Sequence, residues 1–196
     1  MRRLLVATTN PGKQAELRRL LAPLGAEIVV PDEVGLDLDV PEPHDTYVDN
    51  ATVKATAYAD ASGLPSIADD SGIEVAALDW GPGVRSARWG GADKVTSLLE
   101  ALPAGSDRRA RMVCVIALAI PGRAAGTEVE TFTGTVEGTV AESRRGGGGF
   151  GYDPVFLLPQ GVTTAELSEV EKDALSHRGR AVAAALPRLR EVLSDA

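Results

Sequence analysis

The chain begins with a strand, a loop and a helix, and this order restricts its possible folds more than any other feature. Residues 4–7 form a compact apolar run, which predicts a buried strand. Asn10 is a favourable N-cap residue, and Pro11 stands at the first helical position. Leucines then recur at helical spacing until Gly25, which predicts the end of the helix.

The loop between this strand and this helix has the features of an anion site. It leaves backbone N–H groups at the positive end of the helix dipole. Lys13 adds a charge that is unfavourable there unless an anion is present, and Thr8 and Asn10 add hydroxyl and amide groups. The loop lacks the second Gly-Lys-Ser/Thr element of a Walker A sequence, and an ordinary capped helix is the alternative.

Two adjacent carboxylates, Asp69 and Asp70, follow the apolar residues 64–68. We predict a strand entering a turn at these carboxylates and a second strand, 73–76, leaving it, with Gly72 supplying the freedom for the turn. Neighbouring side chains of a strand point to opposite faces, so both carboxylates can face inward only if the backbone turns between them. A metal ion, a basic partner or a retained proton would relieve their repulsion. The alternative is a solvated turn.

Glu42 lies between two prolines in the acidic, proline-rich segment 31–45. Because the prolines stiffen the backbone, Glu42 is a candidate metal ligand on a rigid arm, and an exposed acidic loop is the alternative. Thr46 and Asp49 resemble a capping box that opens a helix. Asp49, Asn50 and Lys54 lie off the apolar stripe of that helix, which predicts a solvated face for them.

The second half of the chain is richer in strands. Residues 111–120 and 127–140 are long β-prone runs separated by Pro121-Gly122-Arg123 and its neighbours, and we predict an antiparallel pair. A short helix is predicted at 93–102. No internal repeat is evident, and no linker is long enough to separate independent domains.

A glycine-rich stretch, 146–154, surrounds two aromatic residues and an acid. Glycines allow backbone to approach a ligand closely, Phe150 or Tyr152 offers a face for a planar base, and Asp153 offers an acceptor. A flexible loop is the alternative. Further on, His177 and Arg178 open an amphipathic helix, where a cation opposes the helix dipole. Their donors suit a carbonyl or a phosphate.

Composition excludes several classes of function. The net charge of -8 argues against a broad surface for polymeric DNA or RNA, and the single cysteine, Cys114, argues against a disulfide framework. No signal peptide opens the chain and no apolar run is long enough to span a bilayer. We therefore expect a soluble, cytoplasmic protein with no membrane partner.

Four motifs, in this order, resemble the inosine triphosphate pyrophosphatase family over nearly the whole chain. They are Thr8-Thr9-Asn10-Pro11-Gly12-Lys13, Ala68-Asp69-Asp70-Ser71-Gly72, Gly149-Phe150-Gly151-Tyr152-Asp153-Pro154, and Glu171-Lys172 with Leu175-Ser176-His177-Arg178-Gly179. The resemblance implies an α/β fold: one domain, 1–196, of two lobes, with a mixed, strongly twisted sheet flanked by helices and a central nucleotide-binding cleft. It also implies a homodimer that uses Mg2+ to hydrolyse ITP, dITP and XTP to the monophosphate and pyrophosphate.

The resemblance also implies roles for individual residues. Asp70 would be the general base, and Glu42 and Asp70 would bind Mg2+. The residues implied to contact the nucleotide are Thr8, Thr9, Asn10, Pro11, Gly12, Lys13, Ser71, Phe150, Gly151, Tyr152, Asp153, Lys172, His177 and Arg178.

The chain departs from the family pattern at three places. Arg85 stands where an aromatic residue is usual, the segment after Gly91 is shorter, and Pro43-His44-Asp45 replaces a small, glycine-containing turn. Two other functions stay open: a Maf-like pyrophosphatase acting on other nucleotides, and a nucleotide-binding regulator without catalysis. The adjacent Asp69 and Asp70 argue against the regulator, because a carboxylate facing a triphosphate weakens binding unless a metal intervenes.

Overall fold

The computed structural model describes residues 2–122 and 126–195 and divides into two compact units. Unit 1 comprises Met1–Asp70, Cys114–Gly134 and Arg180–Ala196, and unit 2 comprises Ser71–Val113 and Thr135–Gly179. The organisation as a single domain stays a prediction.

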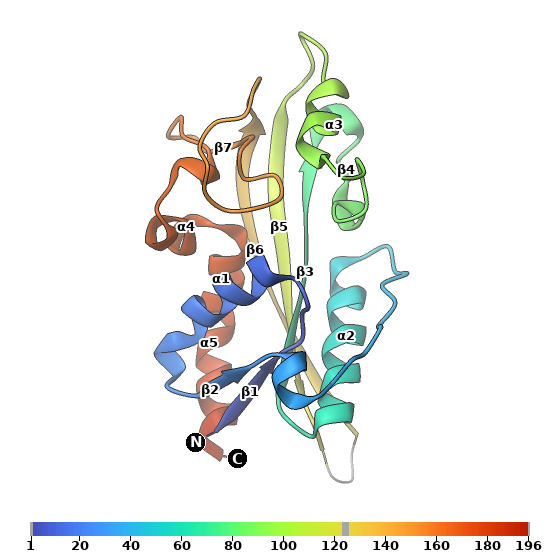
Figure 1. Ribbon diagram of the computed structural model, residues 1–196, viewed down its shortest axis with the longest axis vertical. Helices are drawn as coiled ribbons and strands as arrows, with labels where there is room; N and C mark the ends of the chain where they lie inside the picture. The colour runs from blue at the N-terminus through green and yellow to red at the C-terminus, as the bar shows by residue number, and fades with distance from the viewer. Residues whose placement is uncertain (1, 123–125, 196) are drawn as a thin grey trace. The chain divides into compact units, whose positions relative to one another are not determined.

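The described strands form one mixed sheet of seven strands (Figure 1). The strand order is β2-β1-β3-β5-β6-β7, and β4 pairs with β3. Strand β1 runs parallel to β2 and β3, whereas β4 is antiparallel to β3 and β7 to β6. The predicted α/β class with a mixed sheet is therefore confirmed. The strands are β1 (Arg3–Val6), β2 (Glu27–Val29), β3 (Ser66–Val75), β4 (Gly81–Pro82), β5 (Arg109–Ile120), β6 (Glu128–Val140) and β7 (Phe156–Leu157).

The helices are α1 (Pro11–Leu21), α2 (Tyr47–Ser62), α3 (Lys94–Glu100), α4 (Glu169–Leu175) and α5 (His177–Asp195). Helices α1, α2, α3 and α5 begin within one residue of where the sequence patterns predict, whereas α4 was not predicted. Short 3₁₀ turns lie at Ala22–Leu24, Pro31–Val34, Ala76–Leu78, Gly83–Arg85 and Thr164–Glu166. None of the described helices is both long enough and apolar enough to cross a bilayer.

In unit 1, helices pack on both faces of the strands (Figure 1). The residues of β1 alternate, so that Leu4 and Val6 pack with α1 and α5, whereas Leu5 and Ala7 pack with α2. Strand β3 follows the same rule, with Ile67 on the α1/α5 face and the next residue, Ala68, on the α2 face. Burial on both faces fixes the register of these strands, because a one-residue shift would reverse every side chain.

Unit 2 has a separate apolar core. It joins the second half of β3, the helix α3, and parts of β5, β6 and the segment 152–158. The members deepest in this core include Ile73, Leu98, Leu102 and Phe156.

The turn predicted at Asp69–Gly72 is wrong, because β3 continues through it as one strand. Strands β1, β4 and β5 all neighbour β3 in the sheet. The Ile73 N–H also donates to the buried Ser86 hydroxyl (2.9 Å). These tertiary partners hold residues with turn propensity in an extended backbone. Both carboxylates therefore stand on a regular strand.

The β5 and β6 runs are neighbours in the sheet, as predicted. The Val140 N–H donates to the Arg108 carbonyl (2.8 Å), so the end of β6 meets the start of β5, as an antiparallel pair requires. The predicted connection at Pro121-Gly122-Arg123 lies partly outside the described residues.

Gly179 in the first turn of α5 has no room for a side chain. A Cβ there would lie 1.8 Å from the Asp173 carbonyl oxygen of α4. We expect Gly179→Ala to lower the free energy of unfolding by about 1–3 kcal/mol, because overpacking outweighs the better helix propensity of alanine. Urea unfolding tests this. Gly147→Ala is the matched control, since a Cβ there meets no atom within 4 Å, and equal stability of the two variants would contradict the prediction.

Candidate functional site

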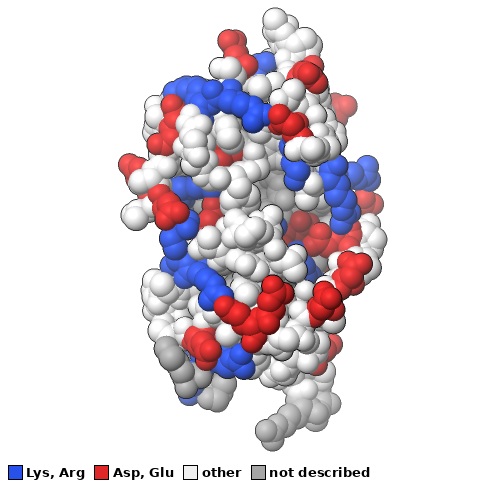
Figure 2. Space-filling view, in the orientation of Figure 1, with Lys and Arg blue, Asp and Glu red and all other residues white. Residues whose placement is uncertain are grey.

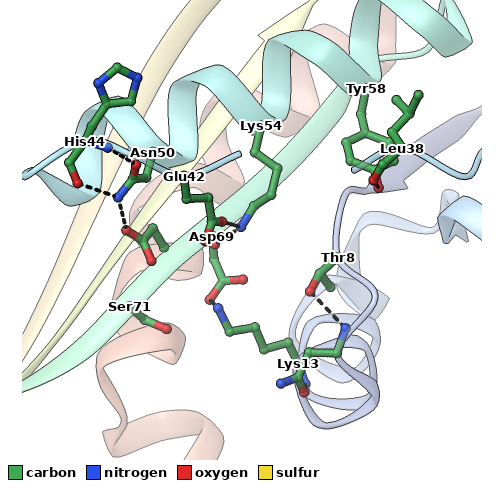
Figure 3. Close-up of polar contacts among 12 residues, drawn as sticks. Thr8, Lys13, Leu38, Glu42, His44, Asn50, Lys54, Tyr58, Asp69 and Ser71 are labelled. Carbon is green, nitrogen blue, oxygen red and sulfur yellow. Dashed lines mark hydrogen bonds and ion pairs between the residues drawn. The ribbon is translucent and has the colours of Figure 1, made fainter. Parts of the chain in front are cut away.

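The two adjacent carboxylates of β3 have partners on opposite faces of the strand. Figure 3 shows Asp69 directed toward Lys13. Asp69 faces α1, where its Oδ2 lies 3.0 Å from the Lys13 Nζ. Asp70 faces α2, where its Oδ2 accepts a hydrogen bond from the Asn50 Nδ2 (3.1 Å). Both side chains are buried. The strand thus separates two like charges that the sequence places next to each other.

Lys54 of α2 joins two parts of this cluster. Its Nζ forms a short ion pair with Glu42 Oε1 and donates to the Asp69 carbonyl oxygen (2.9 Å), as Figure 3 shows. Only 13% of the Lys54 side chain is exposed. We refer below to Lys13, Glu42, Lys54, Asp69 and Asp70 as the carboxylate–lysine cluster.

The prediction that Asn50 and Lys54 lie on a solvated face is wrong, whereas Asp49 is exposed as predicted. Helical periodicity identified the stripe that packs against apolar residues. It could not show that the sheet beside α2 carries buried carboxylates. Polar side chains of α2 that pair with these carboxylates are buried too. The one indication in the sequence is the spacing of Asn50 and Lys54, which stand four residues apart and so lie on one side of a helix.

Burial is the main influence on the pKa of Asp70. Desolvation raises this pKa above its ordinary value, and the charge of Glu42 raises it further. The hydrogen bond from Asn50 and the two lysines act in the opposite direction. For Lys54, burial by itself lowers the pKa, but the charges of Asp69 and Glu42 outweigh it, so the pKa is raised and the ammonium stays charged.

The start of α1 forms the predicted capped turn. Asn10 Oδ1 accepts from the Lys13 N–H (3.1 Å), and Thr8 Oγ1 accepts from the Asn10 N–H (3.3 Å). Thr8 is buried, whereas Thr9, Asn10 and Pro11 are exposed and Gly12 is half-buried.

The donor set suits Mg2+, which prefers oxygen ligands and usually keeps several waters. In the part of the chain that is described, no group of three or more His, Cys, Asp or Glu side chains is arranged to hold a metal. Glu42 and Asp70 are close enough to interact electrostatically, whereas the Asp69 side chain is directed at Lys13. The protein would therefore supply two carboxylates, Glu42 and Asp70, to a bound Mg2+. Glu42 is also paired with the Lys54 ammonium.

A second cluster lies in unit 2 around Phe150. The Lys172 Nζ lies 4.9 Å from the centroid of this ring, and the Arg178 guanidinium carbon lies 5.5 Å from it. Arg178 Nη2 also donates to the Ser71 hydroxyl (3.0 Å). His177 is buried beside Arg178 at the start of α5. Ser71, Phe150, Lys172 and Arg178 are therefore brought together.

Asp153 holds this second cluster in place. Its Oδ2 accepts from the Phe150 N–H (2.7 Å) and lies 2.6 Å from the Lys172 Nζ, and its Oδ1 accepts from the Thr164 hydroxyl (2.8 Å). A Cβ at Gly149 would lie 2.1 Å from Asp153 Oδ2, which explains a glycine there. The loop is thus bound by specific hydrogen bonds.

The two aromatic candidates of this loop occupy different environments. Tyr152 packs in the unit 2 core and donates to the Ser86 carbonyl oxygen (3.1 Å), and burial raises its pKa to about 12. Phe150 is only half-buried, and Gly151 between them is exposed with a φ of +64°. Phe150 is therefore the more exposed of the two rings.

On the face drawn in Figure 2, acidic and basic side chains are interspersed.

The fold and the carboxylate–lysine cluster define an α/β protein with ion-paired acidic and basic side chains gathered on one part of its sheet. The chain belongs to the Ham1 family, whose family model matches residues 4–188. This membership confirms the resemblance identified from the four motifs.

Individual relatives match almost end to end. The chain is 47% identical over 203 residues to a dITP/XTP pyrophosphatase of Symbiobacterium thermophilum, covering 99% of this chain and 98% of the relative. Among solved structures, a HAM1 protein from Coxiella burnetii is 39% identical with a TM-score of 0.83, covering 100% of both chains. A nucleoside-triphosphatase / dITP/XTP pyrophosphatase from Mycobacterium abscessus is 42% identical with a TM-score of 0.72, covering 95% of this chain and 99% of that one.

Asp70→Asn should stabilise the protein in the absence of nucleotide and metal. A raised pKa means that the folded state pays a free-energy cost once Asp70 is ionised. The cost is absent below the unfolded-chain pKa of about 3.9 and is fully present above the folded value. We expect the variant to be about 0.5–2 kcal/mol more stable than wild type at pH 7, with a difference that shrinks as the pH falls.

Urea unfolding in EDTA at several pH values measures this difference. Asp39→Asn, at an exposed position, is the control for removal of one negative charge. An Asp70→Asn variant less stable than wild type at pH 7 would contradict the expectation.

Proposed function

We propose that this chain is a nucleoside-triphosphate pyrophosphatase that hydrolyses ITP, dITP and XTP to the monophosphate and pyrophosphate, and so removes deaminated purines from the nucleotide pool. The observation that carries the proposal is the carboxylate–lysine cluster, on β3, α1, α2 and the segment before α2, in a chain 47% identical to a dITP/XTP pyrophosphatase.

Unit 1 carries the hydrolytic chemistry in this proposal. Lys13 supplies positive charge to the triphosphate, and the loop Thr8–Gly12 supplies hydroxyl, amide and backbone N–H donors. Lys13 is held at 3.0 Å from Asp69 Oδ2, so its ammonium is already positioned before substrate arrives. Preorganised charge of this kind costs no reorganisation during the reaction.

Asp70 accepts the proton of the attacking water. A carboxylate whose pKa is raised by burial is a stronger base than an exposed one. The water attacks phosphorus, and the bond to the pyrophosphate leaving group breaks. Glu42 and Asp70 would hold Mg2+, which when bound neutralises phosphate charge and polarises the phosphoryl oxygens.

Unit 2 recognises the base. Phe150 offers a ring face, and Arg178 has only donors, so it can pair with the 6-carbonyl of hypoxanthine or xanthine but not with the 6-amino group of adenine. Lys172 and His177 add further donors beside it. Asp153, whose oxygens already accept from Phe150, Lys172 and Thr164, positions these groups.

We propose further that the chain acts in the cytoplasm as a homodimer, as the family resemblance implies. Light scattering on the purified protein measures its oligomeric state. The Maf-like activity and the non-catalytic regulator remain the alternatives, and the experiment that follows separates them.

Pyrophosphate release from a panel of nucleoside triphosphates tests the proposed activity. We expect Mg2+-dependent turnover of dITP, ITP and XTP, with much slower turnover of dATP and dCTP. We also expect Asp70→Asn to lower kcat about 100-fold to 10,000-fold, since it loses a general base. Preferred turnover of other nucleotides would support the Maf-like activity, and tight binding without turnover would support the regulator.

Arg178→Ala tests the account of base selection. A site built around a buried donor rejects an amino group because two donors then face each other. We expect the variant to lower kcat/KM for ITP far more than for ATP, and so to narrow the gap between them. Arg178→Lys, which keeps the charge but loses the planar fork, should lie between wild type and Arg178→Ala. Equal losses for ITP and ATP would show that Arg178 does not contact the base.

A further inference from the structure

Asn50 occupies a position in unit 1 that none of the nucleotide contacts explains. The residue is only 2% exposed. Its Nδ2 donates to Asp70 Oδ2 (3.1 Å) and to the His44 carbonyl oxygen (3.1 Å), and its Oδ1 accepts from the His44 N–H (3.0 Å). Figure 3 shows this amide between the chain at His44 and β3.

These hydrogen bonds fix which way the amide points. A flipped amide would place its oxygen against two acceptors, the His44 carbonyl and the Asp70 carboxylate. One N–H of Asn50 is therefore always directed at Asp70 Oδ2. This restricts the rotation of the carboxylate and leaves its other oxygen, Oδ1, outside this bond.

The other two hydrogen bonds hold the arm that carries Glu42. His44 follows Glu42 by two residues, with Pro43 between them. Because the proline ring fixes one backbone torsion, anchoring both polar groups of His44 also limits the motion of Glu42. The prolines on either side of Glu42 restrict its backbone, and the hydrogen bonds from Asn50 to His44 hold the end of this segment in place.

We propose that Asn50 is a positioning residue that couples the two carboxylates expected to hold Mg2+, orienting Asp70 directly and Glu42 through the backbone of His44. The inference rests on the proposed function. Residues that orient metal ligands typically contribute 10-fold to 100-fold in metal affinity or activity. In this proposal Asn50 acts only through Asp70 and His44 and is not itself a ligand of the metal.

Steady-state kinetics with dITP test the proposal through the dependence on Mg2+. We expect Asn50→Ala to lower kcat about 10-fold to 100-fold and to raise the Mg2+ concentration for half-maximal activity. The KM for dITP should change little, because the phosphate and base contacts stay in place. Asn50→Leu, which keeps the volume of the side chain, should behave in the same way.

A second readout does not depend on activity. Binding of a metal to the folded state raises its melting temperature. We expect millimolar MgCl2 to raise Tm of wild type in the absence of nucleotide, relative to NaCl of equal ionic strength, and to raise Tm of Asn50→Ala much less. Ala59→Gly is the matched control, because it weakens the same helix by about 1 kcal/mol at a buried position that lacks polar contacts to the cluster.

A double variant that combines Asn50→Ala with Glu42→Gln tests whether Asn50 acts through Glu42. If Asn50 acts partly through the arm of Glu42, the effects of Asn50→Ala and Glu42→Gln on the Mg2+ requirement will be less than additive in the double variant. Simple additivity would overturn the coupling.

Three other results would overturn the inference. One is wild-type kcat and Mg2+ dependence in Asn50→Ala and Asn50→Leu, which leaves the proposed function standing if wild type turns over dITP. Another is a loss of kcat and of Mg2+ response in Ala59→Gly equal to that in Asn50→Ala. Unfolding of both Asn50 variants would have the same meaning, since either result would show that Asn50 contributes to stability alone. The last is a wild-type protein without pyrophosphatase activity, which removes the proposed function as well.

Discussion

The alternation of side chains along β3 is the constraint on which the candidate site depends. One residue of the strand faces α1 and α5, and the next faces α2. Asp69 and Asp70 are neighbours in sequence, yet this alternation gives them different partners: Lys13 on one side and Asn50 on the other. A slip of one residue in the register of β3 would exchange the two environments. The apolar residues Ile67 and Ala68, each buried on its own face, prevent such a slip.

Charge balance follows from this separation. Buried carboxylates are tolerated only when they are paired or hydrogen-bonded. Asp69 has the ammonium of Lys13, and Glu42 has that of Lys54, which also reaches the Asp69 carbonyl oxygen. Asp70 has a neutral amide as its hydrogen-bond partner, and its pKa is raised by burial. The strand thus gives its two adjacent carboxylates different partners, the Lys13 ammonium for Asp69 and the Asn50 amide for Asp70.

Much of the fold could be predicted because its signals are local. The cap at Asn10, the proline after it and the periodic leucines define α1, and Thr46 defines the start of α2. The α/β class and the family followed from motifs of this kind. The turn at Asp69–Gly72 could not be excluded in the same way, since Asp, Ser and Gly favour turns wherever neighbouring strands do not hold them extended.

The missing parts of the site are those whose partners are distant in sequence. Asn50 and Asp70 are 20 residues apart, and Lys54 and Glu42 are 12 apart. Helical periodicity assigned Asn50 and Lys54 to the solvent-exposed side of α2, because periodicity shows only which side of a helix is apolar. Polar burial depends on what the adjoining sheet presents, and no local pattern carries that information. Phe150 and Tyr152 illustrate the same limit: the sequence offers two rings, and only packing shows that Tyr152 belongs to the core.

In the proposed function, the neighbouring residues Asp69 and Asp70 have separate tasks, and the kinetics of Asp69→Asn compared with those of Asp70→Asn test this division most directly. For dITP with saturating Mg2+, Asp69→Asn should mainly raise KM, because Lys13 loses its ion-pair partner. The general base Asp70 and the water that it activates are retained in this variant. Asp70→Asn should mainly lower kcat. Equal falls in kcat for the two variants, with KM unchanged in both, would contradict the division of roles.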